Sequence, residues 1–335
     1  MKVLFSCGLP FFLAHGGAQT LTEELMLGLQ GLGVEVEPAR WWDEDQKGDI
    51  LHFIGRPSTL NVRLAHKKGF KVIMTDLLDQ TASRSGSRLF LQRTITRLIK
   101  NFVPKFTGQL NWEVYRELDA MVYAVPHERE VAKYLFNARA DRGHVIPHGL
   151  EENVIADLRQ PQPQEDYLIS VATIDPRKNA LLLAQAAHRA KVPIVFLGKP
   201  YSVESSYLRQ FQDRVDDVYV RYPGFVAEAE KRRYLRSARG FVLLSQFESG
   251  CIAVFEAAAA GLPLLLSDLP WATKGYPCNH HMSFVKLAHN VEGLASSLKA
   301  FHEHARRQAN PIFPILSWRQ VAQKYLKVYE SVMRS

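Results

Sequence analysis

Short apolar runs recur along the chain and alternate with longer stretches in which apolar residues return every three or four positions. A short continuous apolar run is typical of a strand buried on both faces of a parallel sheet, and the longer stretches are typical of amphipathic helices. The strands predicted in the first half are Lys2–Ser6, Val34–Glu37, Ile50–Ile54, Lys71–Thr75, Met121–Ala124 and His144–Ile146. Those predicted in the second half are Tyr167–Ala172, Ile194–Leu197, Val218–Arg221, Phe241–Leu244, Leu264–Ser267 and Ser283–Lys286.

A polar stretch rich in Pro and Gln, EENVIADLRQPQPQED, separates the two halves from residue 151 onward. This composition is typical of a linker. Because strands and helices alternate on both sides of it, we predict an α/β protein with two doubly wound parallel-sheet domains, residues 1–150 and 151–317. The last segment, SWRQVAQKYLKVYESVMRS, has the pattern of an amphipathic helix with Ser317 at its N-cap.

The composition describes a globular protein with a full core, with 47% hydrophobic and 23% charged residues. The three cysteines have no metal-type spacing, which favours free thiols in a reducing compartment. The formal net charge of +8 favours an anionic partner, which could be nucleic acid, acidic lipid or a phosphorylated small molecule. No recognised nucleic-acid-binding module is present in the sequence, which argues against nucleic acid as the partner.

The chain begins with MKVLFSCGLPFFLA, an apolar run of the length found in signal peptides. No small-x-small cleavage site follows it; a glycine turn and a helical pattern with Leu21, Leu25 and Leu29 on one face follow instead. We therefore interpret Lys2–Ser6 as a first strand, with a signal peptide as the alternative. No run is long enough to span a membrane, so a cytoplasmic protein is expected.

The stretch FVLLSQFESGCIAVFEAAAAGLPLLLSD, residues 241–268, places two carboxylates inside an otherwise apolar or small-residue unit. It predicts a buried strand, a turn, a helix over Cys251–Ala260 and a second strand. Ligands of such sheets bind beyond the carboxyl ends of the strands, where Glu248 lies, and Glu256 falls inside the helix. Taken singly, each glutamate is better explained by a solvated position, Glu248 in a loop and Glu256 on an exposed helix face.

Other motifs also follow predicted strands. HGGAQ, at 15–19, is a glycine turn that could bring backbone N–H groups close to a ligand, although a plain tight turn fits it equally. Arg177 and Lys178 follow a strand in ISVATIDPRKN and suit a diphosphate, with a solvated loop as the alternative. VFLGKP ends a further strand on Gly198, and YPGFVAEAEKRRYLRSA begins a charged helix.

In this order and at these separations, the motifs resemble those of the retaining glycosyltransferases of family 4, which have the GT-B fold. The matching segments are the Glu-x7-Glu pair Glu248 and Glu256, Pro176–Asn179, Gly224–Ala238, Ile146–Gly149 and Ser317–Tyr329. The resemblance covers nearly all of the second half and the ends of the first. It implies two Rossmann-like domains facing a cleft, an acceptor-side domain and a donor-binding domain. It also implies that the C-terminal helix, residues 318–335, packs back on the first domain.

The resemblance also implies roles for individual residues. Glu248 would contact hydroxyls of the transferred sugar, and Glu256 would accept hydrogen bonds from the ribose, which a carboxylate can do with two oxygens. Arg177 and Lys178 would stabilise the departing nucleoside diphosphate, which would make a metal ion unnecessary. The other donor-binding positions would be Gly16, Gly17, Gly198, Phe225, Val226, Ser249, Gly250, Cys251 and Ile252.

The first half departs from the family pattern at the end of its fourth strand. The family usually carries a His there, close to the sugar, whereas this chain has Thr75 followed by Asp76. Asp76 is therefore the candidate for contact with the sugar or acceptor. His127, which falls near a stretch that often borders the cleft, is better explained as a surface residue. The acidic run Asp43–Asp45 resembles a metal motif of another glycosyltransferase fold, but we interpret it as a solvated loop.

Residues 83–106 carry six cations and no carboxylate, interleaved with apolar residues at helical spacing. One interpretation is a core-packed helix with a solvated basic face. The other is an interfacial helix on which Arg88, Arg93, Arg97 and Lys100 meet anionic lipid or an anionic acceptor. The second interpretation predicts a protein held peripherally at the inner face of the cell membrane.

The resemblance implies an enzyme that moves a sugar from a UDP- or GDP-sugar to a glycan or lipid-linked acceptor, in the synthesis of cell-surface polysaccharide or glycolipid. It implies no cofactor beyond the nucleotide-sugar donor. Two alternatives stay open: a non-catalytic sugar-nucleotide-binding subunit, which the missing His favours, and a sugar-nucleotide epimerase of the same fold.

Overall fold

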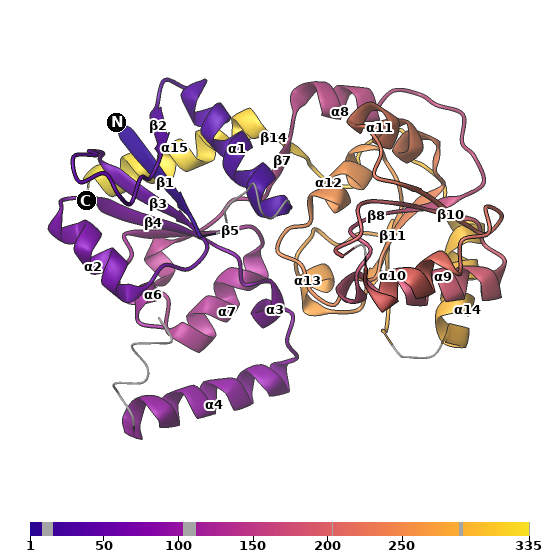
Figure 1. Ribbon diagram of the computed structural model, residues 1–335, viewed down its shortest axis with the longest axis horizontal. Helices are drawn as coiled ribbons and strands as arrows, with labels where there is room; N and C mark the ends of the chain where they lie inside the picture. Colours follow the sequence, from indigo (N-terminus) through magenta and orange to yellow (C-terminus); the bar gives the residue numbers. More distant parts are fainter. Residues whose placement is uncertain (9–15, 103–111, 203, 288–290, 335) are drawn as a thin grey trace. The chain divides into compact units, whose positions relative to one another are not determined.

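The computed structural model describes residues 1–8, 16–102, 112–202, 204–287 and 291–334 (Figure 1). The side chains of residue 79 and residues 100–102 lie outside this description, and the membrane-contact candidate Lys100 is one of them. The chain divides into two compact units, residues 1–149 with 316–335 (unit 1) and residues 150–315 (unit 2). In the described part, no helix has both the length and the apolar character needed to cross a membrane.

Unit 1 is built on a six-stranded parallel sheet with the order β2-β1-β3-β4-β5-β6. Its strands are β1 (Lys2–Cys7), β2 (Glu35–Pro38), β3 (Ile50–Ile54), β4 (Lys71–Asp76), β5 (Ala120–Tyr123) and β6 (Gly143–Val145). Its helices are α1 (Gly17–Gln30), α2 (Thr59–Lys67), α3 (Asp79–Ala82), α4 (Gly86–Phe102), α6 (Val114–Glu117), α7 (Pro126–Phe136) and α15 (Trp318–Arg334). A 3-10 turn, η1 (Ala140–Arg142), precedes β6, and the short strands β7 (Gly149–Leu150) and β14 (Leu316–Ser317) pair with each other.

The C-terminal helix α15 packs against α1 and the sheet of unit 1, which confirms the expected return of the chain. Gly28 allows the close approach, since a Cβ there would lie 2.8 Å from Cβ of Ala322. A buried polar network fixes the helix: Nδ1 of His52 lies 2.7 Å from Oη of Tyr329. Thr75 joins this network through Nε2 of His52 at 2.8 Å and Oη of Tyr325 at 3.0 Å.

Unit 2 is built on a second six-stranded parallel sheet, with the order β10-β9-β8-β11-β12-β13. Its strands are β8 (Leu168–Val171), β9 (Ile194–Leu197), β10 (Val220–Gly224), β11 (Gly240–Leu243), β12 (Leu264–Ser267) and β13 (Met282–Val285). Its helices are α8 (Glu152–Leu158), α9 (Ala180–Ala190), α10 (Ser206–Gln212), α11 (Glu228–Ser237), α12 (Ile252–Ala259), α13 (Pro270–Thr273) and α14 (Val291–His304), with a 3-10 turn, η2 (Pro176–Lys178).

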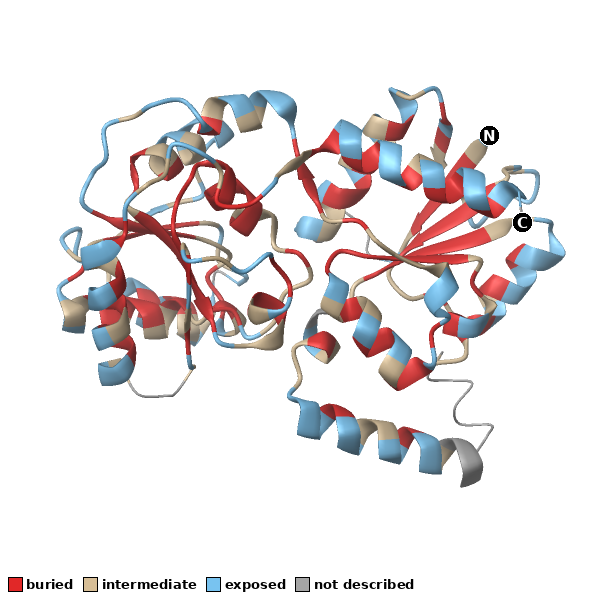
Figure 2. Cartoon of the chain, turned by 180° about the vertical axis from the view of Figure 1, so that it is seen from behind, coloured by how far each residue is buried: buried red, intermediate tan, exposed pale blue. Residues whose placement is uncertain are grey.

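Two hydrophobic clusters, one on each face of this sheet, form the core of unit 2. Side chains of α8, α11 and α12 belong to one cluster, and those of α9, α10 and α14 belong to the other. Figure 2 shows the strands as almost wholly buried, with the outer faces of the helices exposed. The continuous apolar runs of the sequence are thus strands covered on both faces, and the prediction of two parallel-sheet domains is confirmed.

The linker prediction for residues 151–166 is wrong in its first half. Residues 152–158 form α8, because Val154, Ile155 and Leu158 give the segment an apolar side that packs on the core of unit 2. The irregular chain is therefore confined to residues 159–166, where the Pro and Gln residues lie. The basic segment 83–106 does form a helix, α4, as far as residue 102.

Candidate functional site

The loops that follow β8 and β11 meet because these two strands are neighbours in the parallel sheet of unit 2. Asp175 caps η2 in the first loop, with its Oδ1 accepting from the backbone N–H of Lys178 at 3.0 Å. Asn179 ties the loops together by donating from Nδ2 to the carbonyl of Leu244 at 2.7 Å. Both loops are thus held where ligands of such sheets bind, at the carboxyl ends of the strands.

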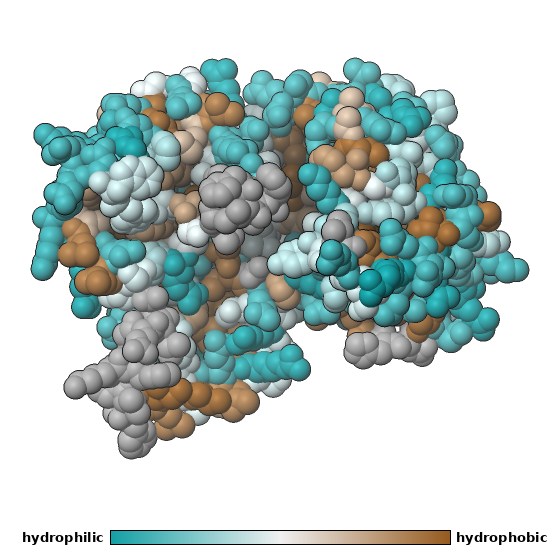
Figure 3. All heavy atoms as spheres, viewed as in Figure 1, coloured by the Kyte–Doolittle hydropathy of each residue, from teal (hydrophilic) through white to brown (hydrophobic). Residues whose placement is uncertain are grey.

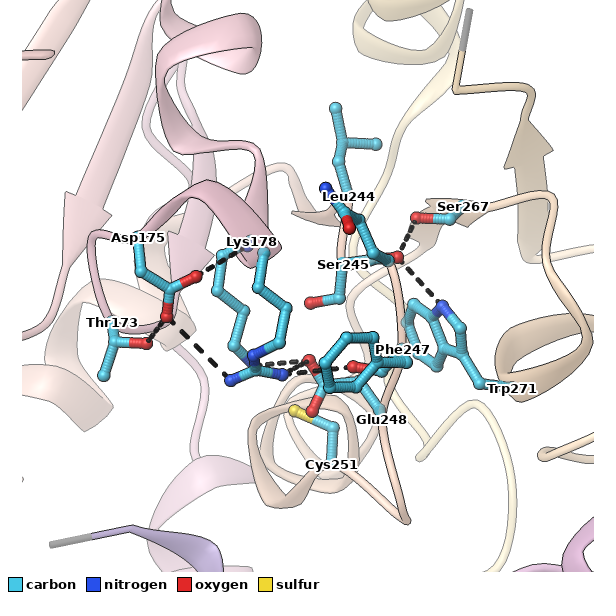
Figure 4. Close-up of polar contacts among 12 residues, drawn as sticks. Thr173, Asp175, Lys178, Leu244, Ser245, Phe247, Glu248, Cys251, Ser267 and Trp271 are labelled. Carbon is cyan, nitrogen blue, oxygen red and sulfur yellow. Dashed lines mark hydrogen bonds and ion pairs between the residues drawn. The ribbon is translucent and has the colours of Figure 1, made fainter. Parts of the chain in front are cut away.

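The end of β11 is fixed from the opposite side as well. The carbonyl of Ser245 accepts from Oγ of Ser267 at 2.7 Å and from Nε1 of Trp271 at 2.9 Å. Trp271 is 2% exposed, so it anchors the turn from inside the core (Figure 4). The turn that carries Glu248 therefore has a rigid support on both sides.

Arg177, Lys178 and Glu248 form one ion cluster at this edge. Figure 4 labels two of its members, Lys178 and Glu248. Oε1 of Glu248 accepts from Nζ of Lys178 in a short contact and from Nη1 of Arg177 at 3.2 Å. The side chains of Lys178 and Glu248 are only 9% and 10% exposed, whereas that of Arg177 is 33% exposed. The interpretation of Glu248 as a solvated surface carboxylate therefore does not apply, and the three residues are brought together as one group.

Arg177 makes further contacts that define its orientation. Nη1 donates to the carbonyl of Phe247 at 3.1 Å, and the guanidinium lies 5.2 Å from the centre of the Phe247 ring. Nη2 lies 4.0 Å from a carboxylate oxygen of Asp175. Both cations thus have carboxylate partners, with which a bound anion would compete.

The start of α12 only partly matches the expected diphosphate cradle. Gly250 adopts a left-handed conformation, with φ +64°, that turns the chain into the helix. The backbone N–H of Cys251, however, donates to Oη of Tyr276 at 3.0 Å. That N–H group therefore already has a hydrogen-bond acceptor within the protein. Burial raises the pKa of the Cys251 thiol to about 11, with Glu248 adding to the effect, so the thiol is neutral at pH 7.

Glu256 belongs to a second ion cluster, with two residues of α11 that the sequence did not single out. Its Oε1 lies 2.7 Å from Nζ of Lys231, which in turn lies 2.8 Å from Oε2 of Glu228. Burial raises the pKa of Glu256, and Lys231 opposes this rise. Burial also acts to lower the pKa of Lys231, but Glu256 and Glu228 outweigh it and the pKa is raised. Glu256 is thus paired through its oxygen rather than solvated.

The loops after β9 and β10 hold the other donor-binding candidates of unit 2. Gly198 has φ +149°, and a Cβ there would lie 2.0 Å from the carbonyl oxygen of Ala172, so only glycine fits. Phe225 is 65% exposed, and Nζ of Lys199 lies 4.3 Å from the centre of its ring. Val226 is half-buried against the core cluster that includes α12. An exposed aromatic ring with a cation above it offers a flat surface on which a planar group can stack.

The candidates in unit 1 are placed differently. Gly16 and Gly17 lie at the start of α1, and none of the described residues lies within 4 Å of a Cβ added at either glycine. Asp76 is 2% exposed, and its Oδ2 accepts from Oη of Tyr115 at 2.5 Å. Thr75 is hydrogen-bonded to His52 and to Tyr325 of α15. Asp76 is thus a buried carboxylate in this state, and its contact with a sugar or acceptor stays a prediction.

The exposed face of α4 is more apolar than basic. Phe90, Leu91, Ile95 and Leu98 are 65%, 59%, 46% and 51% exposed. Brown side chains gather at this place on the surface in Figure 3. Arg88 and Arg97 are exposed beside them, but the guanidinium of Arg93 lies 4.2 Å from the ring centre of Tyr134 on α7. Arg93 therefore packs between the two helices and does not belong to the exposed face.

The described residues contain no group of three or more His, Cys, Asp or Glu side chains that could hold a metal ion. Within the acidic run, the carboxylate of Asp43 accepts from the guanidinium of Arg40 at 2.9–3.0 Å. Arg40 also pairs with Glu37 at 3.0 Å, so these charges form a local network on the surface of unit 1.

Two parallel-sheet units, with a C-terminal helix that returns to the first, are the arrangement of the GT-B fold. The model of the family described as glycosyl transferases group 1 matches residues 155–311. The chain is thus similar to this family over almost the whole of unit 2. The matched range contains Arg177, Lys178, Lys231, Glu248 and Glu256.

Two curated relatives share part of the chain. The O-antigen chain mannosyltransferase B of Escherichia coli is 26% identical over 151 residues, which cover 40% of this chain and 39% of that protein. The mannosylfructose-phosphate synthase of Agrobacterium fabrum (strain C58 / ATCC 33970) is 21% identical over 244 residues, covering 65% and 54%. The chain thus spans about two fifths and about half of the length of these relatives.

Solved structures extend the likeness of fold to the whole chain. The sucrose-phosphate synthase from Thermosynechococcus elongatus has a TM-score of 0.71 at 15% identity, with 100% of both chains covered. WaaG, a glycosyltransferase involved in lipopolysaccharide biosynthesis, has a TM-score of 0.58 at 13% identity, with 98% of both chains covered. At such identities the likeness concerns the fold alone, and it confirms the predicted fold class.

Proposed function

We propose that the chain is a retaining glycosyltransferase that binds a nucleotide-sugar donor at the carboxyl edge of the sheet in unit 2. The observation that carries this proposal is the ion cluster of Arg177, Lys178 and Glu248, which lies where the two central strands of that sheet end. Cations at such an edge suit a diphosphate, and a carboxylate beside them suits sugar hydroxyls. Similarity to the group 1 glycosyltransferases supports the same reaction class.

The geometry supports an exchange of partners when the donor binds. The diphosphate would become the partner of Lys178 and Arg177, both of which donate to Glu248 in the structure. Glu248 would then be free to accept hydrogen bonds from the sugar. As the bond to the sugar breaks, negative charge grows on the leaving diphosphate, and the two cations would stabilise it there. Because the protein supplies this charge, we propose that no metal ion is needed.

The remaining donor contacts follow from the same placement. Glu256 would accept from the ribose hydroxyls, Phe225 would stack with the base, and Gly198 would let the backbone approach the donor. Ser249, Gly250 and Ile252 would offer backbone N–H groups to the diphosphate at the start of α12, with Cys251 contributing after Tyr276 releases its N–H. Gly16, Gly17 and Asp76 of unit 1 are proposed to reach the sugar or the acceptor.

We further propose a glycan or lipid-linked acceptor and attachment of α4 to an anionic membrane surface. The exposed apolar face of α4, with Arg88 and Arg97 beside it, supports an interfacial helix. Names among the similar proteins point the same way, since one is an O-antigen chain mannosyltransferase and another acts in lipopolysaccharide biosynthesis. Cell-surface polysaccharide or glycolipid synthesis is therefore the proposed setting.

A second candidate function is a non-catalytic subunit that binds a sugar nucleotide. Thr75 and its network favour this alternative, because Thr75 is 1% exposed and bound to His52 and Tyr325 where the resemblance leads one to expect a sugar-contacting His. A binding subunit would hold the donor and leave it intact.

A thermal-shift panel of UDP, GDP and their sugars tests the donor site, because a ligand at 100 times its Kd stabilises the folded state by about 2.7 kcal/mol. We expect either the uridine or the guanosine compounds to raise the thermal unfolding midpoint of the wild type, and not that of Lys178→Ala. Donor hydrolysis, followed as released nucleoside diphosphate, then separates an enzyme from a binding subunit. Absence of any shift across the panel would contradict the proposed function.

Co-sedimentation with vesicles containing anionic lipid tests the membrane surface. Arg88→Gln with Arg97→Gln should weaken binding at low salt by about 30-fold, since each cation near such a surface is worth about 1 kcal/mol. The matched control is Arg129→Gln with Arg139→Gln, which removes the same charge from exposed positions elsewhere in unit 1. Equal loss in both variants would show a general charge effect, and α4 would not be the docking element.

A further inference from the structure

Three charged side chains of α11 and α12 form a chain from the surface of unit 2 into its interior. Glu228, on the outside, contacts Lys231 at 2.8 Å, and Lys231 contacts Oε1 of Glu256 at 2.7 Å. Their side chains are 61%, 18% and 8% exposed, in that order. We propose that Lys231 is a positioning residue that keeps Glu256 ionised and directs its second oxygen to the ribose diol of the nucleotide. This inference rests on the proposed donor site.

The surroundings of Glu256 explain why it needs a partner. It lies in a helix whose neighbouring side chains, from Val254 to Ala259, are small or apolar and buried. A carboxylate in such a place tends to take up a proton, because its charge has lost the solvation of water. A protonated carboxyl group has turned one oxygen into a donor, so it can no longer accept from both hydroxyls of a ribose.

Lys231 supplies the opposing charge from the adjacent helix. Its position is fixed twice, by Glu256 on the inside and by Glu228 three residues earlier on the same helix. Two further charged groups of α11 act on Glu256: Glu228 raises its pKa, and Arg232, whose guanidinium is held by Asp157 of α8 at 2.5 Å, lowers it. Arg232 is thus committed elsewhere, and Lys231 is the cation whose atoms reach a Glu256 oxygen.

This arrangement makes a specific demand on the nucleotide. An ionised Glu256 with one oxygen held by Lys231 would favour a ribose with both hydroxyls over a 2′-deoxyribose. A hydrogen bond to a charged group corresponds to about tenfold or more in affinity. The wild type should therefore bind a ribonucleoside diphosphate at least about tenfold more tightly than its 2′-deoxy counterpart.

Isothermal titration with UDP and GDP and their 2′-deoxy counterparts, from pH 6 to pH 8.5, tests the inference. For the wild type, the ribose-to-deoxyribose ratio should stay constant over this range. For Lys231→Met, the ratio should fall toward one at pH 6 and recover as the pH rises, because Glu256 would then ionise only at higher pH. Lys231→Arg should keep the ratio, and so should the control Glu230→Gln, which removes an exposed carboxylate of the same helix that pairs with Arg233 instead.

Several results would overturn the inference. A uniform loss of affinity in Lys231→Met, with an unchanged ratio at every pH, would mean that the lysine only supports the fold. If the ribose-to-deoxyribose ratio of the wild type falls as the pH is lowered from 8.5 to 6, Lys231 does not keep Glu256 ionised. This measurement uses the wild type alone, so it does not depend on whether a variant folds. If the wild type binds neither UDP nor GDP, the proposed donor site fails and the inference fails with it.

Discussion

Replacement of Glu248 by Gln removes one charge from the ion cluster and keeps the size of the side chain. Lys178, which is 9% exposed, would lose its carboxylate partner, and Arg177 would lose one of two. Removal of one partner of a buried ion pair destabilises a protein by about 3–5 kcal/mol. The lower end applies here, because Arg177 keeps the carbonyl of Phe247 and is itself one third exposed.

A loss of about 3 kcal/mol should lower the unfolding midpoint of unit 2 by about 6–12 °C, since about 1 kcal/mol corresponds to 2–4 °C for a domain of 150–250 residues. The variant should also bind a nucleoside diphosphate more tightly, because the anion no longer competes with Glu248 for the two cations. If the Kd falls tenfold, saturating ligand would add about 1.4 kcal/mol more stability to the variant than to the wild type. Transfer activity should nevertheless be lost.

Thermal unfolding followed by circular dichroism, with and without the bound nucleotide, measures both effects. Glu230→Gln is the matched control, since that side chain is 45% exposed and its ion pair with Arg233 spans 3.8 Å. An exposed pair contributes about 0–1 kcal/mol, so the control should unfold like the wild type. A Glu248→Gln variant as stable as this control, with no added gain from nucleotide, would refute the view that Glu248 and the diphosphate share the same cations.

Three further predictions concern catalysis, backbone and pH. Lys178→Ala should lower kcat by about 10²-fold or more and Arg177→Ala by less, while activity survives EDTA; abolition by EDTA with rescue by Mn²⁺ would contradict the metal-free mechanism. Gly198→Ala should destabilise the fold by at least about 1–3 kcal/mol in urea unfolding, because its Cβ would lie 2.0 Å from a carbonyl oxygen. Gly86→Ala should not, because its Cβ would have none of the described residues within 4 Å. Burial lowers the pKa of His52 to about 3, so below pH 6.5 the unfolded state takes up a proton that the folded state excludes. The contribution of His52 to the unfolding free energy should therefore fall by about 1.4 kcal/mol per pH unit from pH 6.5 toward pH 3. Urea unfolding at pH 7 and pH 5 measures this loss. A His52→Phe variant should not show it, whereas the exposed-site control His304→Gln should show it like the wild type.

The strands were predictable because their signal is local. A strand buried on both faces must be apolar at every position, and runs such as Phe241–Leu244 carry that signal without help from the rest of the chain. The helix α8 was missed because its apolar side, Val154, Ile155 and Leu158, is short and adjoins a run of Pro and Gln. The Pro- and Gln-rich composition of residues 151–166 therefore indicated a linker, and the helical spacing of these three apolar residues was too short a signal to indicate a helix.

The carboxylates of the site could be found from sequence, but their partners could not. Glu228 and Lys231 are three residues apart on a charged helix, a pattern typical of a surface pair. That Lys231 reaches Glu256, 25 residues further along the chain, depends on the packing of α11 and α12 against the same face of the sheet. Tyr276, which holds the N–H of Cys251, and His52, which holds Thr75, were missed for the same reason.

The paired state of the cations changes how the site should be understood. From the sequence, Arg177 and Lys178 form a positive loop that waits for a diphosphate. In the structure, Glu248 is paired with both of them. Such a site would bind free anions weakly, because each must compete with a carboxylate that cannot diffuse away. A sugar nucleotide can compensate for this competition, since its sugar hydroxyls give the displaced Glu248 new partners. A free diphosphate offers no such hydroxyls beside the cations, so the ion pairs of Glu248 with Arg177 and Lys178 would favour the intact donor over the product.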